Sequence, residues 1–334
     1  MARKKIITVA ALAASVMLRC SGFILAGGAQ GTGAYQFLQL GVGARPAALG
    51  EAFAGVSGDI NALYWNPSGI AGLERTELSM THTLWLQGIT YSNIAYARPA
   101  LGGVIGAAFN LLATGDIQKA DNTGLRLDES YGMTDTLAVV SYARSWGGLA
   151  LGANFKYISS RLEEEASRSY AADAGALYSC ALPWGRRLGL GLSVQHAGGR
   201  ARYVSEKSSL PVITRAGLSM ELSRNLLAVS DLKYIESVVS AHAGAEYTRA
   251  LGAIVLAARA GYKNDTVKEL GALSGITAGA GAGWNGYQFD YAWNSFSDLG
   301  IAHRLSLSIK FGRSGVKKMP AAVVPGRTVK GARS

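Results

Sequence analysis

The stretch HRLSLSIKF, residues 303–311, decides the fold class. Every second residue from Leu305 to Phe311 is apolar, whereas Arg304 and the other alternate positions hold arginine, serine or lysine. Successive side chains of a β-strand point to opposite faces, so this stretch has one apolar and one polar face. It therefore predicts a strand that separates an apolar environment from a polar one.

Segments with the same two-residue period follow one another from residue 75 onward. We count about fourteen of them: 75–86, 88–98, 101–112, 134–145, 148–161, 169–182, 186–197, 209–222, 225–236, 239–250, 251–263, 270–283, 285–295 and 301–312. They are longer than the roughly 5 or 6 residues of a typical globular strand, and close to the roughly 9–11 that cross a bilayer at a tilt. An even number of antiparallel strands is typical of bacterial outer-membrane barrels. The pattern predicts an all-β fold, a transmembrane antiparallel β-barrel of about fourteen strands over residues 75–312.

Two other fold classes fit the sequence less well. No run after residue 30 reaches the roughly 18 uninterrupted apolar residues of a membrane helix, which argues against a helical membrane bundle. A soluble β-sandwich also alternates, but it explains neither the long strands nor the positive mean hydropathy of +0.16. The polar strand face carries charges that a wet barrel lumen can accommodate. We expect these residues to face the lumen: Asp173, Arg215, Asp231, Lys233, Glu246, Arg259, Asp290 and Arg304.

The two ends of the chain carry most of the net charge of +11. Residues 1–29 and 313–334 together hold ten basic residues and no acidic one, so 23 basic residues face 22 acidic ones in between. A nucleic-acid-binding domain would carry its basic excess on the folded part, so we expect no nucleic-acid partner. Residues 313–334 predict a basic, disordered tail.

The N-terminus has the features of an export signal. The basic residues Arg3–Lys5 precede the apolar run Ile6–Leu18, and small residues up to Ala29 follow it. We therefore predict a signal peptide over residues 1–29 and a location in the outer membrane. Cys20 raises the alternative of a lipoprotein, but Leu18 and Arg19 are poor residues to precede a lipidated cysteine.

Residues 30–74 lack the strand pattern and are rich in small residues. Pro46 at a first helical turn predicts a short helix over 47–54, and Asp59 is placed to cap a second helix over 60–65. Asn66, Pro67 and Gly69 then predict a turn. We expect this segment to form a plug in the barrel, with Asp59, Asn66, Pro67 and Gly69 as its gating residues.

The plug sequence also carries a family resemblance. FLQLGVGARPAALGEAFAGVSGDINALYWNPSGIAGL, residues 37–73, resembles the opening of the PorV/PorQ family of outer-membrane proteins, relatives of the FadL long-chain fatty-acid channels. LPVITRAGLSM (210–220) and DYAWNSFSDLGIAHRLSLSIKFG (290–312) resemble later parts of that family. The resemblance implies a fourteen-stranded barrel with an inserted N-terminal segment.

The same resemblance implies two functions. PorV-like members carry exported cargo proteins in type IX secretion, so our first expectation is a role in protein secretion or surface display. The alternative is a FadL-like channel for the uptake of hydrophobic small molecules, against which a polar lumen argues mildly. A structural barrel without transport is a third reading. The implied partners are outer-membrane lipid and lipopolysaccharide, the barrel-assembly machinery, and either secreted cargo proteins or hydrophobic small molecules.

Chemistry-bearing residues form no convincing motif. The four histidines, at positions 82, 196, 242 and 303, have no neighbours at metal-ligand spacing, so we expect neither a metal nor a cofactor. A lipid hydrolase would need a serine and a histidine together on the outward face. His303 has the outward parity, but the sequence assigns no serine to it. We therefore expect no enzymatic activity.

Overall fold

The computed structural model describes residues 35–312 except 116, 121, 122, 124, 164, 183, 184, 200, 204 and 205. The predicted signal peptide (1–29) and basic tail (313–334) lie outside the described residues, as do residues 30–34. Within the described part, no helix has the length and apolar character that crossing a membrane requires.

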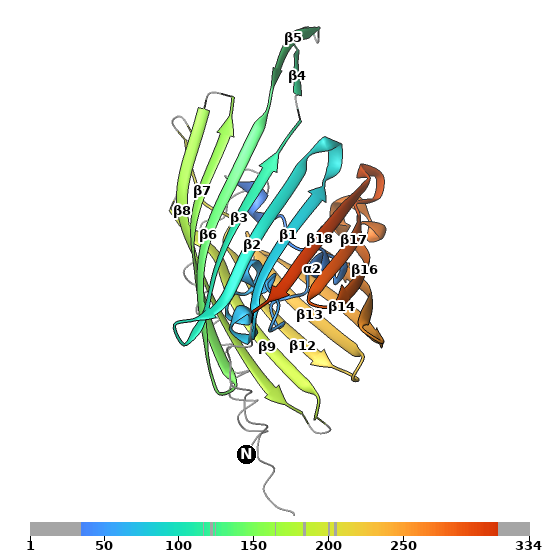
Figure 1. The fold of residues 1–334 in the computed structure, drawn as a ribbon. Coiled ribbons are helices and arrows are strands. Elements are labelled where there is room, and N and C mark those ends of the chain that lie inside the picture. Colours follow the sequence, from blue (N-terminus) through green and yellow to red (C-terminus); the bar gives the residue numbers. More distant parts are fainter. Residues whose placement is uncertain are drawn as a thin grey trace, which may run out of the picture.

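Fourteen antiparallel strands form a closed barrel, in which β1 pairs with both β2 and β18 (Figure 1). The fold class predicted from the alternating pattern is thereby confirmed. The strands, in order along the chain, are β1 (Thr76–Leu84), β2 (Thr90–Ala100), β3 (Gly103–Ala113), β6 (Met133–Trp146), β7 (Leu149–Leu162), β8 (Glu165–Ala181), β9 (Arg187–Gly198), β12 (Ile213–Glu221), β13 (Leu226–Ile235), β14 (Val238–Leu251), β15 (Ile254–Lys263), β16 (Ile276–Trp284), β17 (Tyr287–Ser295) and β18 (Ile301–Phe311).

The predicted strand over 270–283 begins too early. β16 starts at Ile276, because the short helices α4 (Val267–Leu270) and η5 (Ala272–Gly275) precede it. Two hairpins that were not predicted lie in the long connections: β4 (Ile117–Ala120) with β5 (Arg126–Tyr131), and β10 (Ala201–Tyr203) with β11 (Glu206–Ser208). The β4–β5 hairpin projects beyond one rim of the barrel (Figure 1).

The two ends of the barrel differ in their connections. One end, the turn end, has tight turns such as Asn285-Gly286, where both residues have positive φ, 47° and 89°. Two-residue turns of this type match the right-handed twist of the flanking strands. The other end, the loop end, carries the β4–β5 hairpin and the loop that contains α4 and η5.

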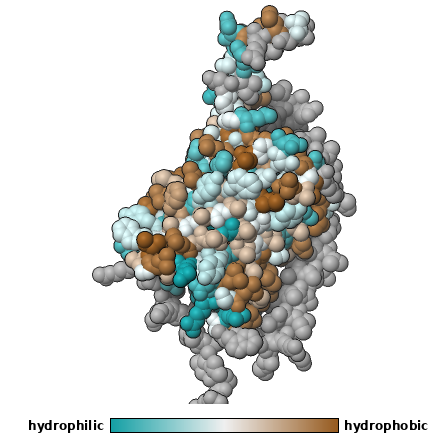
Figure 2. Space-filling view, turned by 90° about the vertical axis from the view of Figure 1, so that its right-hand side faces the viewer, coloured by the Kyte–Doolittle hydropathy of each residue, from teal (hydrophilic) through white to brown (hydrophobic). Residues whose placement is uncertain are grey.

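The outward wall is apolar, whereas the inward wall carries the buried polar and charged side chains together with an apolar stretch on β2, β3, β6 and β7. On β1, Met80 and Leu84 are each 48% exposed, whereas Thr81 and Thr83 between them are buried. Figure 2 shows the face that carries β16 to β18, over which hydrophobic side chains are widely spread. In a soluble protein such a surface would be unfavourable, but against lipid it is the expected arrangement.

The segment from residue 35 to 73 fills the barrel (Figure 1) and is called the plug below. Its elements are η1 (Gln36–Gln39), α2 (Ala44–Ala48), α3 (Ala62–Trp65) and η2 (Pro67–Gly72). The prediction of a helix over 47–54 is wrong, because α2 ends at Ala48, and Gly50 and Glu51 take positive φ angles of 66° and 63°. The second helix also begins later than predicted, since the Asp59 carboxylate accepts from the Asn61 backbone N–H at 2.8 Å before α3 starts.

Candidate functional site

Inward side chains of the wall hydrogen-bond to the backbone of the plug. Asp231 Oδ2 on β13 accepts from the backbone N–H groups of Phe53 and Ala54, both at 2.9 Å. Thr277 Oγ1 on β16 accepts from Gly50 N–H at 3.0 Å and donates to the Ala48 carbonyl at 3.2 Å. The wall therefore satisfies backbone groups that helices in the plug would otherwise pair internally, which explains why those helices are short.

The second half of the plug is held in the same way. Asn154 Nδ2 on β7 donates to the Leu63 carbonyl at 2.8 Å, and Ser193 Oγ on β9 donates to the Trp65 carbonyl at 3.0 Å. Asn66 itself donates to the carbonyl oxygens of Ala54 at 2.7 Å and Ala176 at 3.2 Å. Asn66 thus connects two parts of the plug to β8.

Glycines on the inward wall let the plug backbone approach closely. At Gly191 a Cβ would overlap the Ala54 carbonyl, at Gly175 the Asn66 amide, and at Gly261 the backbone at Gly50. Several of these glycines pair across neighbouring strands: Gly152 with Gly175, Gly191 with Gly217, and Gly244 with Gly261. A larger residue at any of these glycines would push the plug backbone away from the wall.

A first charge network joins the plug to the turn-end half of the wall. Arg45 of the plug contacts Asp59 at 2.8 Å and Glu246 on β14 at 2.6 Å. Arg259 on β15 then contacts Glu246 at 2.6 Å and Asp290 on β17 at 2.7 Å. Burial disfavours the Asp59 carboxylate, but the Arg45 guanidinium outweighs it and the pKa of Asp59 is lowered.

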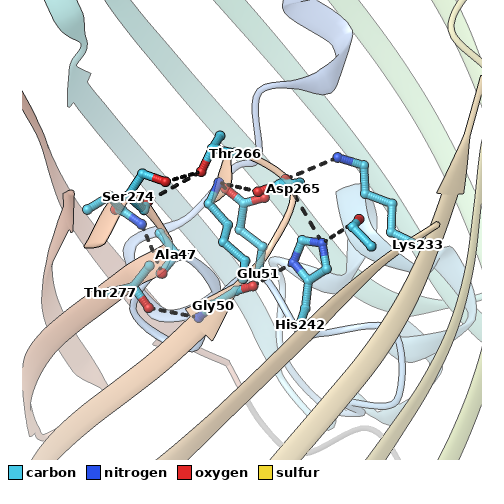
Figure 3. A network of polar contacts seen from close by, with 12 residues as sticks. Ala47, Gly50, Glu51, Lys233, His242, Asp265, Thr266, Ser274 and Thr277 are labelled. Atoms are coloured by element: carbon cyan, nitrogen blue, oxygen red, sulfur yellow. Dashed lines mark hydrogen bonds and ion pairs between the residues drawn. The ribbon is translucent and has the colours of Figure 1, made fainter. Parts of the chain in front are cut away.

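A second charge network joins the plug to the loop end (Figure 3). Glu51 Oε1 of the plug contacts Lys263 Nζ at 3.1 Å, and Asp265 in the loop after β15 contacts Lys233 Nζ at 3.3 Å. His242 Nδ1 lies 2.7 Å from the Gly50 carbonyl oxygen. Despite the opposing effect of burial, the neighbouring lysines, Lys263 foremost, lower the pKa of both Glu51 and Asp265.

A third buried cluster lies at an irregularity between β8 and β9. The register shifts next to Asp173, and His196 takes a φ of 60°, rare for a residue other than glycine. Asp173 accepts from the His196 backbone N–H at 2.8 Å and from Lys156 Nζ at 2.6 Å. The irregularity brings the Asp173 carboxylate and the His196 backbone together.

Two inward arginines pair with plug groups other than carboxylates. The Arg215 guanidinium lies 4.8 Å from the centroid of the Trp65 ring, a cation–π contact. Arg304 Nε donates to Thr83 Oγ1 at 3.0 Å, and its Nη1 lies 3.4 Å from the Gly43 carbonyl. Both side chains are fully buried.

All eight residues expected to face the lumen lie on the inner wall, but not along a wet lumen. The plug covers them, and each is at most 6% exposed. Of the expected gating residues, Asp59 forms an ion pair with Arg45, and Asn66 donates a hydrogen bond to β8. Pro67 and Gly69 are buried in η2. The sequence pattern did not point to Arg45, Glu51, Lys156, Lys263 or Asp265 as site residues. Arg45 and Glu51 are charged residues within a small-residue segment, a signal that could have identified them.

Two cavities lie on opposite sides of the wall at β2 and β3. An inner one of about 20 Å³, between plug and wall, is lined by Tyr64, Lys156 and Asn110 among others. It has room for about one water molecule. An outer one of about 460 Å³, called the wall groove below, opens outward across β17, β18 and β1 to β3. Asn93 on β2 lines both cavities.

Comparison with known proteins gives a family match over part of the chain and a likeness in fold over most of it. Residues 9–173 match the model of an uncharacterised protein family, UPF0164. No curated protein matches the chain. Among solved structures it is similar to a deltaS2 mutant of the TodX monoaromatic hydrocarbon channel (TM-score 0.57, 10% identity, 81% of this chain and 99% of that chain). It is also similar to the toluene transporter TbuX of Ralstonia pickettii (TM-score 0.55, 12% identity, 81% and 99%) and to a FadL homologue of Pseudomonas aeruginosa (TM-score 0.53, 9% identity, 81% and 98%).

At these identities the likeness shows a shared fold. One of these structures is a FadL homologue, so the fold agrees with the FadL-type barrel expected from the sequence. None of these matches names PorV or PorQ, so that resemblance stays a prediction.

Proposed function

We propose that the protein is an outer-membrane channel through which hydrophobic small molecules are taken up, and that it has no enzymatic activity. The outward apolar wall and the tight turns at one end support insertion in the outer membrane, with the loop end outside. The likeness in fold to hydrocarbon channels supports transport over the other readings. In this proposal bilayer lipid and the barrel-assembly machinery are the partners of the wall.

The wall groove is the observation that carries the proposal. Its lining is mostly apolar, and it lies directly outside the inner cavity, with Asn93 common to both. A path straight through the barrel is filled by the plug, which packs against both the polar and the apolar side chains of the inner wall. A path that leaves the barrel sideways at β1 to β3 would cross the wall beside Asn93, where the paired strands would have to separate locally.

A reversible cross-link tests this path. Met80 and Ile94 are directly opposite on β1 and β2, and both face outward in the wall groove. In a Cys180→Ala background, Met80→Cys with Ile94→Cys would join the two strands by a disulfide. We expect oxidation to stop the uptake of a radiolabelled hydrocarbon or fatty acid into proteoliposomes, and reduction to restore it.

The matched control lies elsewhere on the wall. Val140 and Phe155 are also opposite each other and outward-facing, on β6 and β7. Their cysteine pair should leave uptake unchanged. Equal uptake with the Met80–Ile94 disulfide closed or open would refute the sideways path, and no uptake by the wild-type protein would refute the channel.

The secretion role rests on the PorV/PorQ resemblance alone. Recovery of a secreted protein with the barrel, together with no uptake, would support a cargo carrier in place of the channel. Gentle extraction of the barrel from its own membrane, combined with the uptake assay, therefore separates the two functions.

A further inference from the structure

Strand register arranges the wall groove as two rows of outward side chains. Along the row nearer the loop end lie Leu111, Ser92, His82 and Leu305, and along the next row lie Phe109, Ile94, Met80, Leu307 and Phe289. All of these are apolar except Ser92 and His82. The groove therefore has an apolar half and one polar pair at its loop-end side.

Among the residues that the structure describes, the polar pair has one hydrogen-bond donor without a protein acceptor. His82 Nδ1 and Ser92 Oγ are 2.9 Å apart. If Ser92 donates, the neutral imidazole carries its proton on Nε2. If His82 donates, the Ser92 hydroxyl proton is free instead. An unpaired donor facing hydrocarbon is costly, so an acceptor should occupy this position.

A second pair of the same kind lies on the neighbouring strands. Tyr291 OH on β17 and His303 Nδ1 on β18 are 2.8 Å apart. Leu305 pairs with His82 on one side and with Tyr291 on the other, so these two residues flank one leucine in the same row, and His303 lies on β18 one row nearer the loop end. Together they present donors on both sides of a gap one strand wide, on a wall that is otherwise apolar here.

We propose that the wall groove binds one glycerophospholipid of the surrounding bilayer. Its ester and phosphate oxygens are acceptors and would receive hydrogen bonds from the His82–Ser92 pair and the Tyr291–His303 pair. One acyl chain would lie on Met80, Ile94 and Phe109. The bound lipid would cover the wall where it is backed by Asn93. The site does not rest on the proposed transport, but a molecule leaving sideways at the groove would have to displace this lipid.

Binding is favoured over lipid hydrolysis at this position. A serine–histidine pair acts as a hydrolase when a third group orients the histidine. Among the described residues, no carboxylate or amide hydrogen-bonds to His82. The structure therefore supplies a pair that can hold a lipid oxygen, without the further group needed to activate Ser92.

Native mass spectrometry of the full chain in phosphatidylglycerol nanodiscs tests the site. The wild-type barrel should keep one phospholipid after release from the nanodisc. The His82→Ala, Ser92→Ala double variant should lose the polar contacts, and Ile94→Trp should fill the apolar half, so both should release the lipid. Val140→Trp and Tyr170→Phe, outward-facing residues of β6 and β8, should keep it.

Each result decides for or against the site. Retention by the wild type and both controls, with loss in both groove variants, supports the proposal. Equal retention by all five proteins, or by none, overturns it. Release of free fatty acid by the wild type that Ser92→Ala abolishes would also overturn it and show a hydrolase. Heat-dependent migration on gels shows whether each variant has formed a closed barrel.

Discussion

At the residue scale, Asn66 joins two parts of the plug to each other and to the wall. Its amide donates to Ala54 and Ala176, and its oxygen accepts from Ser68, all within a buried site. Asn66→Ala leaves those carbonyl groups unpaired, which should lower the free energy of unfolding by about 2–3 kcal/mol. Urea unfolding in micelles measures this. Asn225→Ala removes an exposed amide that donates to the Thr248 carbonyl, and should change stability by less than about 0.5 kcal/mol. A similar loss for both variants would contradict a special role for Asn66.

Gly191 tests the close approach of the plug to the wall. A methyl group at this position would meet the Ala54 carbonyl, which the surrounding hydrogen bonds hold in place. Gly191→Ala should therefore destabilise the barrel by about 1–3 kcal/mol, as overpacking of a filled interior does. The comparison is Gly115→Ala, at a position with open space around it, where the same unfolding assay should show no loss. An unchanged Gly191→Ala protein would mean that the plug can shift away from β9.

At the scale of elements, the loop after β15 and the plug are linked through charges. Glu51 contacts Lys263, and Lys263 also lies 3.8 Å from Asp265 in that loop. Because the folded protein lowers the pKa of Glu51 below its ordinary value of 4.5, the ionised carboxylate stabilises the fold above that pH. This stabilising contribution is about 1.4 kcal/mol for each unit by which the pKa is lowered. It is lost as the pH falls from about 4.5 toward the lowered pKa.

Glu51→Gln should remove this part of the acid sensitivity. We expect the wild-type unfolding free energy to fall more steeply below pH 4.5 than that of the variant, as measured by urea titrations between pH 3 and 7. Glu165→Gln, on an exposed residue of β8, should follow the wild-type curve. Parallel curves for wild type and Glu51→Gln would show that the link to Lys263 does not stabilise the plug.

At the scale of the molecule, the barrel was predictable and the plug contacts were not. Each strand alternates because one face meets lipid and the other the plug, so a local pattern of period two records the fold. The contact between Arg45 and Glu246 joins residues 201 positions apart, and that between Asp231 and Phe53 joins residues 178 apart. No local pattern encodes such pairs. A water-filled lumen was expected because polar inward side chains can hydrogen-bond equally well to water and to the backbone of a plug.

The fixed plug leads to a prediction about how the whole molecule works. Ala44 N–H donates to Ser306 Oγ at 2.9 Å, which places α2 directly against β18. In the Cys180→Ala background, Ala44→Cys with Ser306→Cys should tether the plug to the wall under oxidising conditions. Ser306 also lines the wall groove, so the reduced form of the same variant is the reference. If molecules leave sideways at the groove, the oxidised and reduced forms should transport at the same rate, because the plug need not move. If the plug has to leave the barrel, oxidation should stop uptake and reduction should restore it. The disulfide between positions 80 and 94 should give the opposite result. It should stop uptake by a sideways path, although it leaves the plug free to move.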